Sequence, residues 1–146
     1  MSHISCERQK ELLPQKIRNK GVFTIEAVNA EIEKPINKFY LLEKTYELLK
    51  ETQITIRQYP KSEKYALAQD TKKAVQDFMT LIISAKKKYH KKTTLQDADI
   101  KLEQIRYYYR MGKEFHYMNI KRYEILSRLN VEIGKMLGGW IQTNQR

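Results

Sequence analysis

Apolar side chains recur at helical spacing along most of this chain, and residues that break helices are scarce. The 146 residues include five glycines and three prolines, so few positions interrupt a helix. After Pro35 an apolar seam runs at alternating steps of three and four residues, which places its members on one helix face. The seam consists of Phe39, Leu42, Tyr46, Leu49, Gln53 and Ile56. This spacing predicts a first helix over about residues 36–57, ended by Tyr59–Pro60 because the residue before a proline avoids the helical conformation.

Three further segments repeat this spacing and begin at residues that cap helices. Ser62 is the expected N-cap of a second helix, Thr94 with Asp97 predicts a capping box for a third, and Asn119 predicts the N-cap of a fourth. The expected packing residues are Leu67, Ala68, Ala74, Val75, Phe78, Leu81, Ile82, Ala85 and Tyr89 in the second helix, Ala98, Leu102, Ile105, Tyr109 and Gly112 in the third, and Tyr123, Leu126, Ile133, Leu137 and Trp140 in the fourth. Because the connections are short, sequential helices should lie antiparallel. The predicted fold is all-α, an up-down-up-down four-helix bundle over residues 35–146.

The charge of the chain is concentrated on this bundle. The formal net charge is +11, from 28 Lys and Arg against 17 Asp and Glu, and residues 36–146 hold 22 of the basic and 12 of the acidic residues. Residues 1–34 are nearly balanced, contain Pro14 and Gly21, and are expected to form an N-terminal extension of one or two short helices, or to be partly disordered. A basic excess of this size suggests a polyanionic partner, since neutralising phosphates releases counterions. A merely soluble basic surface is the alternative.

Cysteine content and hydropathy predict a cytoplasmic protein that does not enter membranes. Cys6 is the single cysteine, so no intrachain disulfide can form and a reducing compartment fits best. The first 30 residues lack the apolar core of a secretory signal. The longest apolar runs, such as Leu81–Ile83, are far too short to span a bilayer.

The residue patterns of enzymes and metal sites are missing, so the chain is expected to have no catalytic, metal or cofactor site. His3, His90 and His116 lie on separate segments without a second ligand at metal-binding spacing. The glycine-rich run Gly134–Gly139 lacks the Lys-Ser/Thr that follows the last glycine of a phosphate-binding loop. Each of these helical glycines costs up to about 1 kcal/mol relative to alanine. Gly134, Gly138 and Gly139 therefore predict close approach of another helix, within the bundle or between subunits, with Trp140 as an anchor.

Two basic clusters are the candidate nucleic-acid contacts. The first comprises Lys86, Lys87, Lys88, Lys91 and Lys92, and the second comprises Lys101, Arg106, Arg110 and Lys113. Arg106 and Arg110 are four residues apart, and like charges at this spacing destabilise a helix unless an anion relieves them. They flank Tyr107–Tyr109, and arginine interleaved with aromatics suits phosphate contact and base stacking on single-stranded or folded RNA. The alternatives are a solvated helix end for the first cluster, and core tyrosines with a solvated arginine edge for the second.

From Lys34 onward the chain resembles the accessory variability determinant (Avd) proteins of diversity-generating retroelements. The last matching run is similar to the family signature E-[IV]-G-[RK]-x-L-G-x-W. The resemblance rests on Lys44–Leu49, Tyr59–Lys61, Asp97–Leu102, Arg106–Arg110 and Glu132–Ile141. It covers about three-quarters of the chain, and the N-terminal extension is a departure from the typical family member.

This resemblance implies a four-helix-bundle protomer that assembles into a barrel-like homopentamer. It also implies a non-catalytic protein that binds RNA or DNA through a basic surface and associates with the retroelement's reverse transcriptase. In that role it would support mutagenic cDNA synthesis and retrohoming. Arg106 and Arg110 match the paired arginines of the family's third helix, and Gly134 and Gly138 match glycines of its last helix.

Two other functions stay open on the sequence alone. The four-helix proteins encoded by intervening sequences of 23S ribosomal RNA genes share the bundle and much of the first helix, although the final tryptophan motif favours the Avd family. A scaffold whose basic face docks an acidic protein partner is the second alternative.

Overall fold

Residues 40–145 are described by a computed structural model, and they form four α-helices and one short 3-10 helix. The elements are α4 (Tyr40–Ile56), η1 (Lys61–Glu63), α5 (Leu67–Lys87), α6 (Lys92–Glu114) and α7 (Ile120–Asn144). The extension predicted over residues 1–34 and the first residues of the first predicted helix lie outside the described residues. Across residues 40–145, no helix combines the length and the apolar character needed to cross a membrane.

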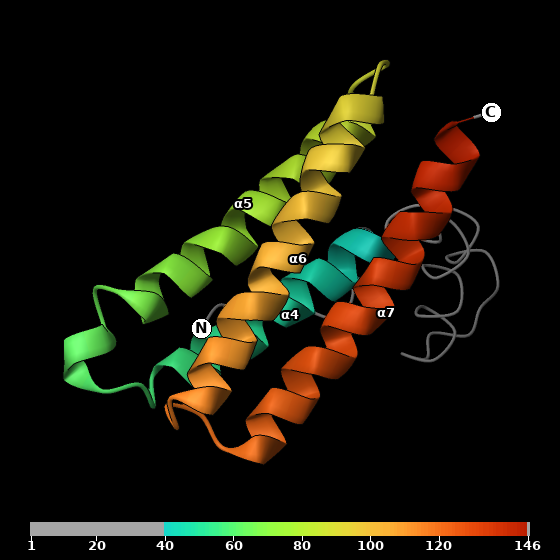
Figure 1. Ribbon diagram of the computed structural model, residues 1–146. Helices are drawn as coiled ribbons and strands as arrows, with labels where there is room; N and C mark the ends of the chain where they lie inside the picture. The colour runs from blue at the N-terminus through green and yellow to red at the C-terminus, as the bar shows by residue number, and fades with distance from the viewer. Residues whose placement is uncertain (1–39, 146) are drawn as a thin grey trace, which may run out of the picture. The chain divides into compact units, whose positions relative to one another are not determined.

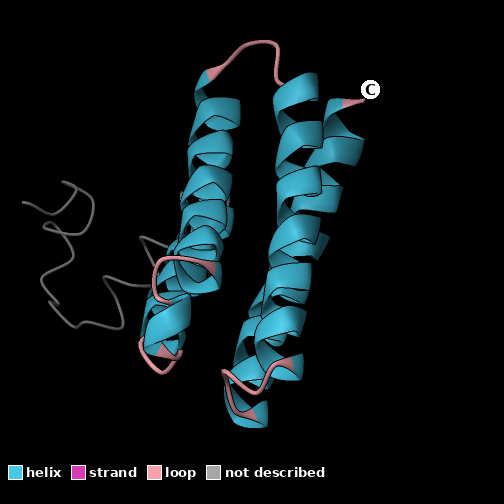
Figure 2. Cartoon of the chain, turned by 60° about the vertical axis from the view of Figure 1, so that its left-hand side comes forward, coloured by secondary structure: helices cyan, strands magenta, loops and turns pink. Residues whose placement is uncertain are grey.

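Consecutive helices run in opposite directions, as their short connections predict. In Figure 1, α5 rises to the turn at the top, α6 descends from it, and α7 rises again to the C-terminus. The closest backbone packing joins α5 to α6 and α6 to α7, and Figure 2 shows the helices from a second side with only short loops between them. The predicted all-helical bundle is therefore confirmed for the described residues.

The core is centred on α6, where the sequence prediction is most accurate. All five residues of its predicted face, from Ala98 to Gly112, are buried. On α7, Leu126, Ile133 and Leu137 are buried, whereas Tyr123 and Trp140 are half-buried. Most of the predicted α5 face is buried as well. Leu81 is half-buried, and Tyr89 is exposed because α5 ends at Lys87 and leaves its ring 91% exposed in the following loop.

The buried face of α4 differs from the predicted seam. Its buried residues are Leu41, Thr45, Leu48, Thr52 and Thr55, one position away from most of the predicted ones, while Tyr46 is 50% exposed. The physical reason is that each buried threonine satisfies its own hydroxyl by donating to the carbonyl four residues earlier, at 2.7–2.8 Å. A threonine bonded in this way needs no water and can face a core. A hydropathy pattern counts such a threonine as polar and therefore predicts the wrong buried face for α4.

Two of the three predicted helix caps are wrong and one is confirmed. Ser62 lies within η1, and α5 begins at Leu67, whose backbone N–H donates to the Glu63 carboxylate at 3.2 Å. Thr94 lies inside α6, which begins at Lys92, and is buried rather than capping. Asn119 does cap α7, since its side chain accepts from the Arg122 N–H at 2.8 Å.

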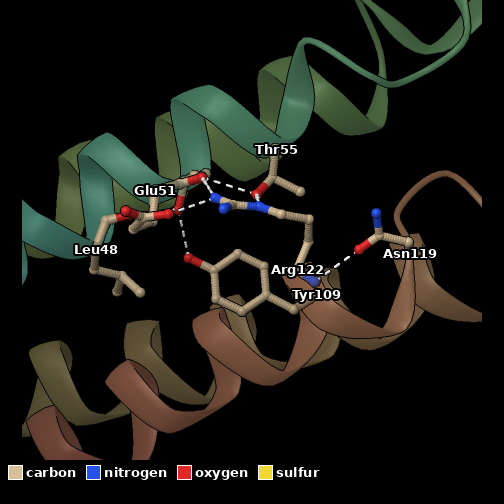
Figure 3. A network of polar contacts seen from close by, with 7 residues as sticks. Leu48, Glu51, Thr55, Tyr109, Asn119 and Arg122 are labelled. Atoms are coloured by element: carbon tan, nitrogen blue, oxygen red, sulfur yellow. Dashed lines mark hydrogen bonds and ion pairs between the residues drawn. The ribbon is translucent and has the colours of Figure 1, made fainter.

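Polar contacts join α4 to the two helices that pack beneath it. Figure 3 shows the Arg122 side chain reaching from α7 to α4, where its guanidinium donates to the Glu51 carboxylate, the Glu51 carbonyl and the Thr55 hydroxyl. The Tyr109 hydroxyl of α6 lies 2.6 Å from the hydroxyl of Thr52. Burial raises the pKa of Tyr109 well above its ordinary value, so the phenol stays protonated and can hold this bond. These contacts add to the apolar packing of Leu41 and Leu48 on the same helix.

Replacing Arg122 should therefore loosen α4. We expect Arg122→Met to lower the free energy of unfolding by about 1–3 kcal/mol, because the half-buried Glu51 carboxylate and the Thr55 hydroxyl lose their donor. Urea unfolding followed by circular dichroism measures the change. Arg110→Met is the matched control, since its ion pair is exposed and it should leave the unfolding midpoint unchanged. Equal midpoints for the two variants would contradict the role assigned to Arg122.

A glycine on α6 makes room for the buried ring of Tyr59. A Cβ at Gly112 would lie 2.2 Å from the Tyr59 hydroxyl oxygen and 2.8 Å from the terminal methyl of Met118. The Tyr59 ring also packs against Tyr117, with centroids 5.4 Å apart. Within the described part of the chain its hydroxyl has no hydrogen-bond partner, and burial raises its pKa to about 12. Gly112 is thus required by packing and not by backbone conformation.

This contact predicts a coupled pair of substitutions. Gly112→Ala should lower the free energy of unfolding by about 1–3 kcal/mol through overpacking. Tyr59→Phe should be neutral or slightly stabilising, because it removes an unsatisfied buried hydroxyl. In the double variant the cost of the alanine should be smaller, and a double-mutant cycle of urea unfolding measures this coupling. Strictly additive effects would show that the two side chains do not compete for the same space.

Candidate nucleic-acid interface

Arg106 and Arg110 are exposed on α6 as predicted, but each is paired with a glutamate of its own helix. Arg106 Nη1 lies 2.9 Å from Glu103, and Arg110 Nε lies 2.9 Å from Glu114. The hydrogen bond to Glu114, together with its charge, raises the pKa of Arg110. The repulsion expected between the two arginines is therefore already relieved within the helix. An anion would have to compete with the two carboxylates.

Arg106 has a second, structural role. Its Nε donates at 3.3 Å to the side-chain oxygen of Asn130, which is buried on α7 and in turn donates to the Leu102 carbonyl at 3.4 Å. This bridge links α6 to α7. Arg110 makes no such link among the contacts found, so its head group is the better placed of the two to move toward a ligand.

The remaining residues of the α6 cluster are only partly available. Lys101 donates to Gln104 at 2.9 Å, and the Lys113 ammonium lies 4.7 Å from the centre of the Tyr123 ring. Of the three consecutive tyrosines, Tyr109 is buried, Tyr108 is half-buried and Tyr107 is 56% exposed. Only Tyr107 could therefore offer an open ring to a base.

The five lysines of the other predicted cluster gather at the α5–α6 turn. Lys86 and Lys87 end α5, Lys92 begins α6, and the Lys88 ammonium lies 3.5 Å from the Thr94 hydroxyl. Lys91 lies 5.6 Å from the centre of the Trp140 ring. Lys92 and Lys101, the nearest members of the two clusters on α6, are about 14 Å apart along the helix and, nine residues apart, lie on opposite faces of it. The structure does not bring the two predicted clusters into one patch.

A third basic region, between α4 and α5, was not predicted from the sequence. Here the two helices and η1 enclose a groove of about 850 Å³, which continues along α4 past Lys50. Its cations are Lys50, Arg57, Lys61, Lys64, Lys72 and Lys73, and its neutral polar residues include Gln53, Gln69, Gln76 and Tyr65. Among residues 40–145, no Asp or Glu lines this α4–α5 groove.

Two of the acidic residues next to the groove in sequence are engaged elsewhere, while Asp70 and Asp77 directly follow the lining residues Gln69 and Gln76. Glu51 faces α7 and binds Arg122. Glu63 accepts from the Leu67 N–H at 3.2 Å and from the Tyr117 hydroxyl at 3.1 Å. The Glu51 and Glu63 carboxylates are thus held by partners that do not line the groove.

A spacing in the sequence could have revealed this groove. On α4, Lys50 is followed by Gln53 and Arg57, at three and seven residues. On α5, Gln69 is followed at three and seven residues by Lys72 and Gln76. Both sets place basic and amide side chains on one helix face without a carboxylate. The predicted apolar seam of the first helix includes Gln53, so this face of basic and amide residues is not recognised from the sequence.

Among the described residues, no close neighbour explains the glycine-rich end of α7. Gly134 has ordinary contacts, with a Cβ placed 3.6 Å from Leu102 Cδ2, and a Cβ at Gly138 or Gly139 would meet nothing within 4 Å. The expectation of a close helix approach inside the bundle is therefore wrong for the described residues. Packing between subunits is the alternative that stays open for Gly138, Gly139 and the half-buried Trp140.

Comparison with known proteins identifies one family. A protein-family model described as bAvd-like matches residues 39–144, which covers the described bundle almost from end to end. No curated protein matches the chain. Among residues 40–145, no group of three His, Cys, Asp or Glu side chains is placed to hold a metal ion.

Proposed function

Because the chain belongs to the bAvd-like family, we propose that it is a basic, nucleic-acid-binding accessory protein of a diversity-generating retroelement. It binds RNA or DNA, associates with the reverse transcriptase of the element, and supports mutagenic cDNA synthesis and retrohoming. Its role is binding and assembly, without a catalytic step of its own.

The observation that carries the nucleic-acid part of this proposal is the α4–α5 groove. Of the described residues, six cations and no carboxylate line it, whereas the arginines of α6 are both ion-paired. A concave surface of one charge focuses its field and attracts polyanions. Phosphate chains are the polyanions that an accessory protein of a reverse transcriptase meets.

A salt series on the full chain tests this proposal. Filter binding of labelled RNA and DNA should show log K falling linearly with log salt, by about 0.7 to 0.9 for each phosphate neutralised. A chain that retains neither polynucleotide at about 50 mM salt would instead belong with scaffolds that dock an acidic protein. Co-purification with the neighbouring polymerase tests the second part of the proposal. A gene neighbourhood with template and variable repeats would separate this function from that of a ribosomal-RNA-associated protein.

The α6 arginines should contribute to binding less than their prominence in the sequence suggests. We expect Arg106→Ala with Arg110→Ala to weaken RNA binding and to reduce the salt slope by no more than about 1.8, the value for two lost phosphate contacts. Gel-shift titration measures the affinity, and circular dichroism checks that loss of the Asn130 bridge has not unfolded α7. Lys121→Ala with Arg128→Ala removes the same charge from exposed positions of α7 and is the matched control. Equal affinity of the α6 variant and the wild type would refute these two residues as contacts.

We also propose that the protomer assembles into a homopentamer through the C-terminal part of α7. Helical glycines destabilise a helix unless something packs against them, and, apart from the adjacent backbone of α7, none of residues 40–145 lies within 4 Å of a Cβ placed at Gly138 or Gly139. A helix from a second subunit could approach closely there, with Trp140 beside it as an anchor. The number five rests on the family resemblance.

Two substitutions at Gly138 distinguish a subunit interface from a surface that stays exposed to solvent. Gly138→Ala should stabilise the isolated protomer by up to about 1 kcal/mol, because it favours the helix and meets no neighbour. Gly138→Leu should leave the helical content unchanged but reduce the subunit count measured by light scattering, since its side chain would occupy the interface. Glu124→Leu, also exposed on α7, is the control. Unchanged assembly of the Gly138→Leu variant would exclude this part of α7 from the interface.

A further inference from the structure

We infer that the α4–α5 groove binds a single-stranded segment of nucleic acid, with phosphates on its lysines and arginine and an unpaired base against Tyr65. This inference rests on the proposed nucleic-acid function and assigns it a site and a ligand form. The site is separate from both clusters that stand out in the sequence, because none of their residues lines the groove.

The cations of the groove are arranged to follow a chain of phosphates. Lys50 lies on α4 and Arg57 directly follows its last residue, Lys72 and Lys73 lie on α5, and Lys61 and Lys64 lie at η1, between the two helices in the chain. A strand lying along the groove would therefore have basic side chains on both sides and at one end. A positively charged groove that follows the backbone is the general way in which proteins hold single strands.

The neutral residues that line the groove are suited to contacts with bases, which phosphate binding alone does not require. Tyr65 is 80% exposed at the groove, with the Lys64 ammonium 5.8 Å from the centre of its ring. An exposed aromatic ring beside a cation offers a stacking surface for a base. Gln53, Gln69 and Gln76 add amides that both donate and accept hydrogen bonds, which matches the mixed donor and acceptor edges of bases.

The ring and the amides favour an unpaired strand over a duplex. In a double helix the faces of the bases are stacked on each other and their pairing edges are occupied, so a protein groove meets mainly phosphates and sugars. Tyr65 would then have no base to stack on. A volume of about 850 Å³ falls within the range of about 300–1,000 Å³ found for sites that enclose small organic groups. It is suited to a nucleotide whose base turns inward.

Fluorescence titration with two probes tests the inference on the full-length protein. One probe is a labelled oligouridine of about 16 nucleotides, at the upper end of known single-strand site sizes, and the other is a blunt RNA duplex of the same length. Tyr65→Ala should weaken oligouridine binding by at least about fivefold and leave duplex binding unchanged, whereas Tyr65→Phe should bind like the wild type. Lys72→Gln with Lys73→Gln should reduce the salt slope for oligouridine by about 1.4.

The controls separate the groove from general charge. Lys121→Gln with Arg128→Gln removes the same charge from exposed positions of α7, outside the groove, and should change oligouridine binding much less than the Lys72 and Lys73 pair does. Ultraviolet crosslinking of a thiouridine-substituted strand, followed by peptide mapping, should yield adducts on residues of α4, η1 or α5. Circular dichroism confirms that the exposed substitutions leave the fold intact.

Three results would overturn the inference. Wild-type affinity of both Tyr65→Ala and the Lys72–Lys73 variant would place binding elsewhere while leaving the proposed function standing. Displacement of oligouridine by polyglutamate as readily as by unlabelled oligouridine would identify an acidic protein segment as the occupant. Failure of the wild-type chain to bind either probe would refute the proposed function as well as this site.

Discussion

The attachment of α4 to the rest of the bundle is the contact on which the other features depend. This helix has threonine where its neighbours have leucine and alanine, and it is joined to α6 through Thr52 and Tyr109 and to α7 through Arg122. Directional bonds of this kind fix the rotation of a helix about its axis more narrowly than apolar packing does. The rotation of α4 in turn decides which of its residues face α5. The α4–α5 groove exists because α4 is held in that orientation.

The same attachment determines the electrostatics of the groove. Glu51 is the acidic residue of α4 that follows Lys50, and its engagement with Arg122 turns it away from the groove and toward α7. One ion pair thus stabilises the fold and removes a negative charge from the basic surface. The α6 arginines show the opposite arrangement, since Glu103 and Glu114 remain beside them and moderate their charge. A high local density of basic residues in a sequence is therefore a poor guide to the strength of the field outside the fold.

Much of the fold could be predicted from the sequence, and the errors have definite causes. The face of α6 from Ala98 to Gly112 was correct because every member is apolar, small or aromatic and the helix is covered by neighbours. The face of α4 was missed because a hydroxyl can be satisfied by its own helix, which no hydropathy pattern records. The groove was missed for a different reason: it joins Arg57 to Lys72 across two helices, and only the packing of the chain shows that these faces adjoin.

The contact between Tyr59 and Gly112 also has a consequence for how such proteins can diverge. The hydroxyl occupies the space that any larger residue at position 112 would need, so position 112 cannot accept a larger side chain while the tyrosine stays. A lineage that first replaces Tyr59 with a smaller residue can then accept a larger residue at position 112. The reverse order would pass through a sterically strained protein. Across homologues, positions 59 and 112 should covary, although they lie far apart in the chain. This covariation would arise from a steric constraint and not from charge.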